Sequence, residues 1–406
     1  MRVSTNQSQQ IAINAMLEQQ EKLSKTQKQV ATGKRIFKPS EDPIGAARVV
    51  DLKINLETNA QYQKNINAAR ARLGIEESIL SNSTDILQRI RELAVASNNA
   101  SQTNETRNFI SEEVNQLLEE VIDMANTTDG SGEYIFAGSK SNFRPFINNE
   151  KGEYTYQGDD TERNIQISTK RIIQTSDSGT YVFRSIKDGN KEFAVLDNKE
   201  NTGTGIIDPG SQTGVYDDGT YAIIFDKKES LDPLEPITYK VVDANNEEVI
   251  PAGTVYVEGA TIEFNGVRVF VEGEPDPEDF FVIRPSENQD IFTTLNNFVG
   301  ALREARGSAS QLAGLHNDLN RTILGIDNAL GRVLEVRSSI GARLQALDAQ
   351  ENINEDYNLQ IKTTLSSIED LDYAEAVSDL NLKLTGLQAS QKAFTRVQNI
   401  SMFDYI

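Results

Sequence analysis

Residues 66–94, INAARARLGIEESILSNSTDILQRIRELA, carry the pattern that decides the fold of this chain. Apolar side chains recur there at steps of three, four or seven positions, a spacing that places them along one face of an α-helix. The stripe consists of Ile66, Ala69, Leu73, Leu80, Leu87, Ile90 and Ala94. The segment therefore predicts an amphipathic helix that packs against a partner along its whole length.

The helix extends outward from this stripe and is expected to cover residues 43–100. Ser40 and Asp42 supply capping oxygens just before it. Pro43 suits the first helical position because no backbone N–H is needed there. A second helix is expected over residues 105–125, where apolar residues keep the same helical spacing.

The C-terminal half of the chain repeats this pattern. A short amphipathic helix is predicted over residues 291–302. A long helix follows, and its apolar stripe consists of Leu319, Ile323, Ile326, Leu330, Val333, Ile340, Leu344 and Leu347. We expect the two long helices to pack against each other as an antiparallel helical-rod bundle built from both ends of the chain.

The two ends of the chain also hold apolar residues in a coiled-coil register. The N-terminal positions are Ile13, Met16, Leu23 and Val30, and the C-terminal positions are Val377, Leu380, Leu384, Leu387 and Phe394. Glutamines take the remaining seam positions, at Gln20, Gln27, Gln391 and Gln398. Fixing the backbone of one residue costs about 1–2 kcal/mol of conformational entropy. A seam that contains this many glutamines buries too little apolar surface to offset much of that cost. We therefore predict that these nine apolar residues form an assembly seam, and that the ends are mobile in the monomer and helical in the assembly.

Between the helical halves, the sequence changes to short β-branched and aromatic runs separated by Gly, Asp and Pro. The clearest signal is Asn265-Gly266, which favours a two-residue type I′ turn and sets Phe264 opposite Val267 in a hairpin. Weaker strands are expected at residues 154–157, 164–168, 181–184, 192–196, 221–225 and 238–242. The insert is thus predicted to be an antiparallel β domain.

These patterns predict a mainly α protein with an inserted β domain and three parts. Residues 1–42 and 370–406 form a terminal coiled-coil assembly domain, residues 43–140 and 286–369 a helical rod domain, and residues 141–285 an outer β domain. The insert holds 27 acidic and 14 basic residues, and is therefore expected to be the most solvated part.

Composition argues against several classes of function. The formal net charge is −21, from 40 basic and 61 acidic residues, so a nucleic-acid backbone or an anionic membrane would be repelled. No stretch approaches the roughly 18 apolar residues of a membrane span, and the first ten residues lack the apolar core of a cleaved signal peptide. With no cysteine and one histidine, we predict no catalytic, cofactor-binding or metal site and no enzymatic activity.

Four features resemble functional sites, and each has a simpler structural interpretation. His316 lies among leucines, so a histidine on a helix surface or seam is favoured over a catalytic one. The acidic run of residues 272–279 lacks the spacing of a calcium loop. Residues 202–205, TGTG, precede no helix or lysine, which argues against a phosphate loop. Glu41 and Asp42 are explained by helix capping rather than by acid–base chemistry.

Lys22, Lys25 and Lys28 form a basic face on the first predicted helix. Such a face is usually only solvated, although it also suits pairing with acidic neighbours in an assembly.

Several longer motifs resemble a known family. Residues 29–50, QVATGKRIFKPSEDPIGAARVV, are similar to the N-terminal hallmark of bacterial flagellin and its relatives. Residues 132–146 (GEYIFAGSKSNFRPF), 366–380 (SSIEDLDYAEAVSDL) and 387–406 (LQASQKAFTRVQNISMFDYI) resemble the flagellar hook–filament junction proteins of that superfamily, as does the opening MRVST. The matches cover residues 1–145 and 262–406, whereas most of the insert resembles nothing that we can name.

The resemblance implies an extracellular, non-enzymatic structural protein of the bacterial flagellum, exported through the flagellar type III apparatus without a cleaved signal peptide. Its implied partners are hook-associated protein 1, flagellin, further copies of itself in a ring, and an export chaperone at the C-terminal segment. Two alternatives stay open: a flagellin that builds the filament itself, and a flagellum-borne cell-wall hydrolase based on carboxylates.

Overall fold

The structure is a computed structural model that describes residues 5–99, 102–149, 154–227, 236–304 and 306–399. The chain divides into two compact units. The first unit combines Met1–Lys64 with Ala349–Ile406, and the second comprises Asn65–Asp348. The division falls within the two longest helices, whereas the sequence patterns placed a domain boundary near residues 42 and 370.

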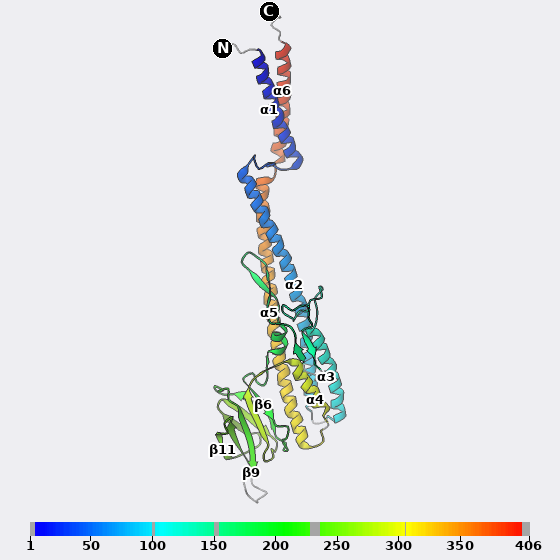
Figure 1. Cartoon of the computed structure of the whole chain (residues 1–406), viewed down its shortest axis with the longest axis vertical. Helices are drawn as coiled ribbons and strands as arrows, with labels where there is room; N and C mark the ends of the chain where they lie inside the picture. Colours follow the sequence, from blue (N-terminus) through cyan, green and yellow to red (C-terminus); the bar gives the residue numbers. More distant parts are fainter. Residues whose placement is uncertain (1–4, 100–101, 150–153, 228–235, 305, 400–406) are drawn as a thin grey trace, which may run out of the picture. The chain divides into compact units, whose positions relative to one another are not determined.

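Six α-helices account for the helical part of the described chain (Figure 1). They are α1 (Thr5–Thr32), α2 (Pro43–Ser97), α3 (Asn104–Ala125), α4 (Ile291–Arg303), α5 (Ala309–Glu369) and α6 (Tyr373–Asn399). The predicted start of α2 is confirmed, because it begins at Pro43 and the Asp42 carboxylate accepts a hydrogen bond from Gly45 N at 2.8 Å. No helix in the described part is long and apolar enough to cross a membrane.

The second unit contains a helical bundle, formed by α3, α4 and the parts of α2 and α5 that lie between residues 65 and 348. The apolar stripe predicted from residues 66–94 is buried in its core, with Ile66, Leu73 and Leu80 fully enclosed. α3 and α4 begin at capped ends, where the Thr103 hydroxyl accepts from Thr106 N and the Asp290 carboxylate accepts from Thr293 N. The predicted bundle is therefore confirmed.

The first part of the insert belongs to this bundle. Its strands are β1 (Phe146–Asn148), β2 (Tyr154–Tyr156), β3 (Arg163–Gln166) and β4 (Ile172–Ser176). Phe146 and Phe183 lie in the helical core and both contact the ring of Phe292 on α4, with ring centroids 5.0 and 5.8 Å away. The predicted domain boundary at residue 141 thus does not coincide with the boundary between the two cores.

One predicted strand is wrong. Residues 180–184 form a single π-helical turn, η1 (Thr180–Arg184), rather than a strand over 181–184. Val182 and Phe183 are both buried in the helical core, and successive side chains of a strand would point to opposite faces.

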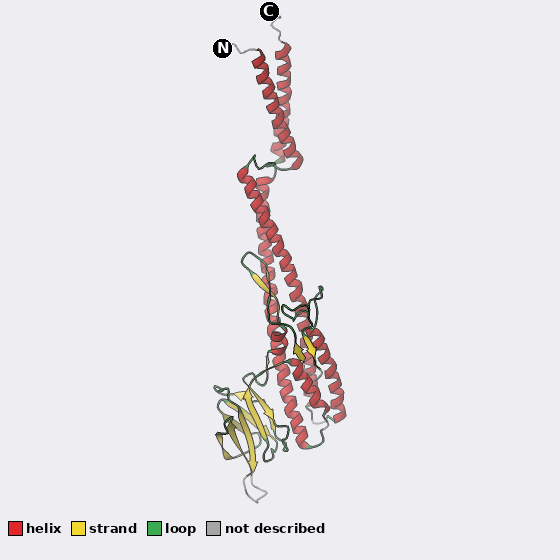
Figure 2. Ribbon diagram, viewed as in Figure 1, coloured by secondary structure: helices red, strands yellow, loops and turns green. Residues whose placement is uncertain are grey.

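The rest of the insert, described over residues 193–227 and 236–285, forms the β domain around a second, separate core (Figure 2). One sheet has the order β11-β10-β9-β14-β6, and the other places β13 between β12 and β7, with β8 also pairing with β13. The strands are β6 (Phe193–Asp197), β7 (Ile206–Ile207), β8 (Ser211–Gln212), β9 (Tyr221–Lys227), β10 (Ile237–Asp243), β11 (Glu248–Val255), β12 (Thr261–Phe264), β13 (Val267–Glu272) and β14 (Phe280–Pro285). The strands predicted near residues 192, 221 and 238 are confirmed, whereas β11 and the central strand β14 were not predicted.

The predicted hairpin is confirmed in its register. Phe264 pairs with Val267 across the turn. Asn265 and Gly266 have φ angles of 40° and 80°, as a type I′ turn requires. The inward side chains of β12 and β13 are buried in the second core. The turn predicted at Asn265-Gly266 therefore sets which faces of these two strands point into that core.

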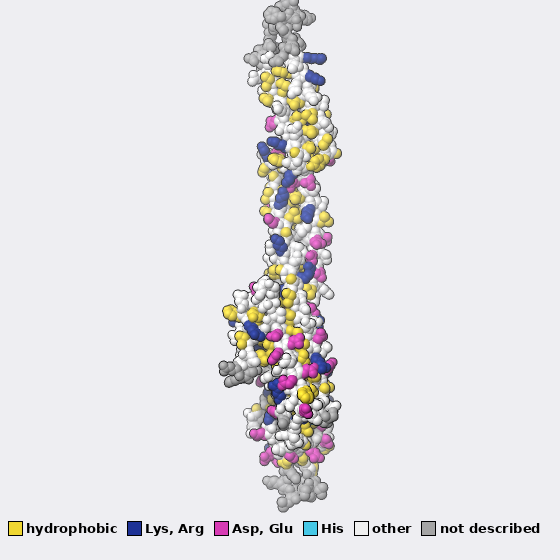
Figure 3. All heavy atoms as spheres, turned by 90° about the vertical axis from the view of Figure 1, so that its right-hand side faces the viewer, with side chains coloured by type: hydrophobic (Ala, Val, Ile, Leu, Met, Phe, Trp, Pro, Cys, Tyr) yellow, Lys and Arg dark blue, Asp and Glu magenta, His cyan; other side chains and the backbone are white. Residues whose placement is uncertain are grey.

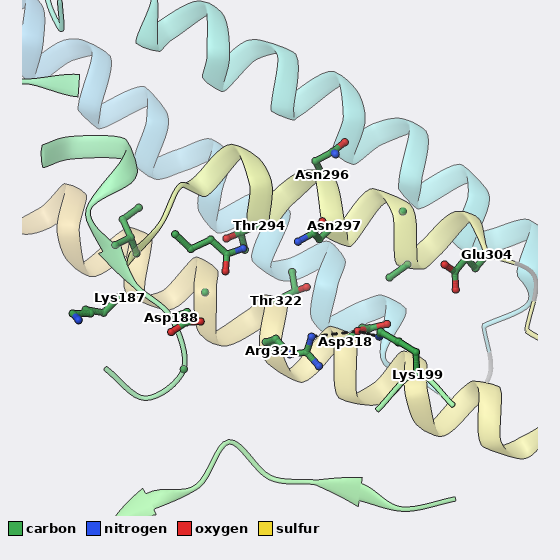
Figure 4. A pocket seen from close by; sticks show the side chains of 16 residues that line it. Lys187, Asp188, Lys199, Thr294, Asn296, Asn297, Glu304, Asp318, Arg321 and Thr322 are labelled. Carbon is green, nitrogen blue, oxygen red and sulfur yellow. Dashed lines mark hydrogen bonds and ion pairs between the residues drawn. The ribbon is translucent and has the colours of Figure 1, made fainter. Parts of the chain in front are cut away.

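Two short strands, β5 (Ile186–Lys187) and β15 (Asn288–Gln289), pair where the chain enters and leaves the β domain. The β domain also contacts α5, because the Asn317 side chain accepts from Ile207 N at 3.0 Å and donates to Gly205 O at 3.2 Å. Lys199 pairs with Asp318 at 2.5 Å beside a polar cavity of about 460 Å³ between α4 and α5 (Figure 4). The β domain is therefore held to the bundle by polar contacts.

Candidate assembly interface

The first unit pairs α1 with α6, and we call these two helices the terminal pair (Figure 1). The enclosed positions of α1 recur with heptad spacing: Ala12, Met16, Gln19, Leu23, Thr26 and Val30. Those of α6 do the same: Ala376, Leu380, Lys383, Leu387, Ser390 and Phe394. The inner seam of the terminal pair thus mixes aliphatic, small and polar side chains.

The predicted seam overlaps with this inner seam only in part. Met16, Leu23, Val30, Leu380, Leu384, Leu387 and Phe394 are buried or half-buried. Ile13 and Val377 are 40% and 43% exposed and lie outside the inner seam. Gln20, Gln27 and Gln391 are also exposed, and the side chain of Gln398 lies outside the described residues. At the positions that are exposed, the residue one place earlier in the sequence is the enclosed one, for example Ala12 rather than Ile13.

The middle of the inner seam is narrow and polar. Thr26 is almost fully buried, and its hydroxyl accepts from Lys383 Nζ at 2.9 Å. The same ammonium pairs with Asp379 at 2.5 Å. At Gly386, a Cβ atom would lie 2.9 Å from Nε2 of Gln19, so a larger residue there would require the flexible Gln19 side chain to move. This seam therefore buries little apolar surface.

Large aliphatic side chains remain on the outside of the terminal pair. Leu17 on α1 is 60% exposed and Leu382 on α6 is 74% exposed, and Ile11 is exposed as well. Figure 3 shows apolar side chains on the face of these helices that it presents. The prediction of the seam missed these residues because it followed a single heptad stripe. The sequence could nevertheless have indicated these residues, because they are large apolar side chains that lie outside the heptad stripe on a predicted helix.

The turn after α1 joins the two ends of the chain. Gly33 has a φ angle of +70°, which glycine adopts at little cost, and a Cβ there would lie 2.9 Å from the Tyr373 hydroxyl. Its carbonyl accepts from Leu371 N at 2.9 Å, and Arg35 N donates to Glu369 O at 2.7 Å. The motif of residues 29–50 thus fixes where α1 ends and how it meets the segment between α5 and α6.

Glu369 is the charged centre of this junction. Its largely buried carboxylate pairs with Lys34 at 2.5 Å and with Lys53 at 2.9 Å. Hydrogen bonding to Lys34, followed by that to Lys53, holds the pKa of Glu369 below its ordinary value of 4.5. The ion pairs therefore connect the α1–α2 turn, α2 and the end of α5.

Glu41 and Asp42 have separate structural roles. Asp42 caps α2, whereas Glu41 accepts from Phe37 N at 2.9 Å and pairs with Lys25 at 3.2 Å. The hydrogen bond from Phe37 N is the main cause that lowers the pKa of Glu41.

The basic face of α1 borders a groove of about 730 Å³, and Leu17 and Lys28 are among the residues that line it.

The other candidate sites are engaged in internal contacts. His316 is half-buried, and its Nδ1 atom is hydrogen-bonded to the Asn98 side chain. The buried Asp279 carboxylate accepts from Thr202 N at 2.8 Å and Gly203 N at 3.0 Å. Asp279 of the acidic run thus accepts from two backbone N–H groups of residues 202–205, in keeping with the structural interpretation of both segments.

Comparison with known proteins agrees with this architecture. The family models of the bacterial flagellin N-terminal and C-terminal helical regions match residues 3–141 and 323–406. A crystal structure of flagellar hook-associated protein 3 from Legionella pneumophila is 34% identical, covers 78% of this chain and 98% of its own, and superimposes with a TM-score of 0.74. A structure described as the flagellar junction protein FlgL from the same organism is 33% identical over 80% of this chain and all of its own, with a TM-score of 0.72. Flagellar hook-associated protein 3 of Escherichia coli K12 is 25% identical over 99% of both chains.

Paired helical ends around a β-rich insert define a flagellin-type structural component of the bacterial flagellum. Within that class, the chain belongs to the family of flagellar hook-associated protein 3, also called FlgL. The fold class and the family resemblance inferred from the sequence are confirmed.

Proposed function

We propose that this protein is an extracellular, non-enzymatic subunit that joins the flagellar hook to the flagellin filament. Its neighbours would be hook-associated protein 1 on the hook side, flagellin on the filament side, and copies of itself in a ring. Support comes from the solved relatives, which are about one-third identical over more than three-quarters of this chain and are described as hook-associated or junction proteins.

The terminal pair carries the structural argument. Its inner seam encloses small and polar residues, whereas Leu17 and Leu382 expose aliphatic surface outside it. An exposed apolar face is stabilised when a neighbouring helix covers it. We therefore extend the predicted assembly seam: Ile13 and Val377, together with Leu17 and Leu382, would contact neighbouring subunits, while Leu23, Leu380, Leu384 and Leu387 hold the two helices together.

Two further contacts are proposed. In the groove beside α1, Lys25 is already paired with Glu41, so Lys28 would be the cation that pairs with an acidic side chain of an adjacent subunit. An export chaperone would bind the C-terminal segment, where α6 offers an amphipathic surface before assembly. The flagellin alternative would place the same architecture in the filament rather than at the junction. The cell-wall hydrolase alternative gains no support from the solved relatives, which are described as hook-associated or junction proteins.

The test uses a flagellated host in which the gene has been deleted. We expect hooks without filaments and flagellin shed into the medium, with motility restored by the wild-type gene. A Leu17→Asp, Leu382→Asp double variant should be secreted but should fail to restore filaments, because it places charges where apolar contacts are needed.

The matched control is a Gln20→Asp, Gln391→Asp double variant, which adds the same charges to exposed polar positions of the same helices. It should restore motility. Normal swimming with the Leu17 and Leu382 variant would refute the proposed contact surface, whereas purified chain growing long filaments alone would instead support a flagellin role.

A further inference from the structure

A cavity of about 370 Å³ lies at the end of the helical bundle, where the α2–α3 and α4–α5 connections meet. Its lining includes Ser97, Thr103, Asn104, Arg107, Arg306 and His316. This gathering of cationic and hydrogen-bonding groups stands out in a chain with a net charge of −21.

Arg107 is a buried cation, and no acidic side chain in the described part of the chain pairs with it. It is only 5% exposed, and its guanidinium donates to two neutral oxygens, Gln102 O at 2.9 Å and Asn104 Oδ1 at 2.7 Å. Its Nε atom is buried and has no hydrogen-bond partner. A buried charge is costly unless an opposite charge or a full set of hydrogen bonds compensates it. Arg107 therefore leaves an unmet demand for an anion beside the cavity.

Arg306 adds a second cation at the same place. Its side chain is nearly buried, pairs with Glu304 at 2.5 Å and lies 3.7 Å from Asp318, yet its Nε atom also has no partner. Burial, followed by repulsion from Arg306, lowers the pKa of Arg107. Asn104 ties the two together, because its Oδ1 accepts from both Arg107 and Arg306 N.

The cavity also lies at the positive end of a helix. Thr103 and Asn104 form the N-terminus of α3, a helix of 22 residues. The Thr103 hydroxyl already accepts from Thr106 N and Glu105 lies in the first turn, so the helix dipole is what this end contributes to binding an anion. The buried guanidinium and the helix end thus point to the same ligand charge.

We propose that this cavity binds a small inorganic oxyanion of the phosphate or sulfate class, held by Arg107 and Arg306 beside His316. A tetrahedral oxyanion has several acceptor oxygens, which can take the unused guanidinium N–H groups while its charge offsets that of Arg107. Bound there, it would link the α2–α3 connection to the α4–α5 connection. This inference does not rest on the role at the hook–filament junction.

The single histidine of the chain makes the test specific, since imidazole signals in untagged full-length protein report on His316 alone. Burial, together with the charge of Arg107, lowers the pKa of His316 from its ordinary value. A bound anion favours the charged imidazolium, so the measured pKa should rise by about one unit when sulfate replaces chloride at constant ionic strength. Sulfate is the first probe because its charge does not change in this pH range, and inorganic phosphate is the second.

Arg107→Gln should abolish the saturable response of His316 to sulfate, and Arg306→Gln should weaken it. Arg306→Gln carries the test alone if Arg107→Gln fails to fold. Arg144→Gln is the matched control, because Arg144 is exposed and lies 3.7 Å from Asp123 at another place in the unit; its response should equal that of the wild type. A pKa of His316 that is the same in sulfate and chloride overturns the proposal, as does a sulfate response that persists in both cavity variants.

Discussion

The helical bundle and the terminal pair are both made of amphipathic helices, yet they bury very different amounts of apolar surface. In the bundle, Leu73 and Leu80 on α2 and Leu319 and Ile326 on α5 all belong to one closed apolar core. In the terminal pair, Leu23 is buried, but Thr26 and Lys383 occupy the middle of the seam and Leu382 is exposed. Helical periodicity alone therefore does not distinguish a stable core from a surface that requires a neighbour.

This difference implies that the two regions depend on assembly to different degrees. The bundle, with its aromatic cluster and closed core, has the contacts needed to fold in a single subunit. The terminal pair has a weaker inner seam, and its exposed leucines gain burial only in an assembly. Three experiments test this contrast, and they differ in the size of the expected effect.

The largest effect should come from deletions that either respect or cross the boundary of the bundle core. Replacing residues 189–286 with Asn-Gly joins Asp188 to Glu287, which are already hydrogen-bonded at 2.9 Å. The bundle should still unfold cooperatively, as measured by circular dichroism during heating. Replacing residues 141–285 with a short linker also removes Phe146 and Phe183, and should abolish cooperative unfolding.

By contrast, the sequence pattern assigns all of residues 141–285 to the outer β domain and so predicts that they are dispensable for the helical part. Equal and cooperative unfolding of both deletions would show that the aromatic cluster is not part of the bundle core.

A smaller effect on stability is expected when a single apolar residue is truncated in the bundle or in the terminal pair. Leu80→Ala removes a fully buried side chain from the bundle, so it should lower the free energy of unfolding by about 2–5 kcal/mol. Leu387→Ala removes a half-buried side chain from the terminal pair, and the main unfolding transition of the monomer should move little. Denaturant unfolding followed by circular dichroism measures both, and a comparable loss in the two variants would remove the contrast.

The smallest effect should concern the ion pairs of Glu369. Its pKa is depressed in the folded protein, so its stabilising contribution is present above the ordinary value of 4.5 and is lost as the pH falls through the folded value. The contribution should be about 1 kcal/mol or less, because both lysine partners are half-exposed. Hydrogen exchange of the amides around Gly33 and Leu371 should speed up below that pH in the wild type.

Glu369→Gln provides the control for this pH dependence. Its exchange rates in that region should already be raised at neutral pH and should change less with acidification, once the intrinsic pH dependence of exchange is subtracted. The same acid-induced change in both proteins would assign the effect to another group.

The sequence by itself determined the features that depend on neighbouring residues. The start of α2 follows from Asp42 and Pro43, the hairpin follows from Asn265-Gly266, and the long helices follow from apolar periodicity. Each of these signals acts over a few residues, through capping, turn geometry or side-chain direction. The family could be inferred for the same reason, since its motifs are contiguous stretches at the two ends.

Only the tertiary structure decided which of two adjacent registers forms the inner seam. Ile13 and Ala12 both continue a heptad pattern, and the packing of α1 against α6 encloses the smaller residue and leaves the larger one exposed. Contacts between distant residues likewise placed Phe146 and Phe183 in the bundle rather than in the β domain, and brought Arg107, Arg306 and His316 to one cavity. These outcomes depend on packing between segments that are far apart in the chain, and local periodicity carries no information about that packing.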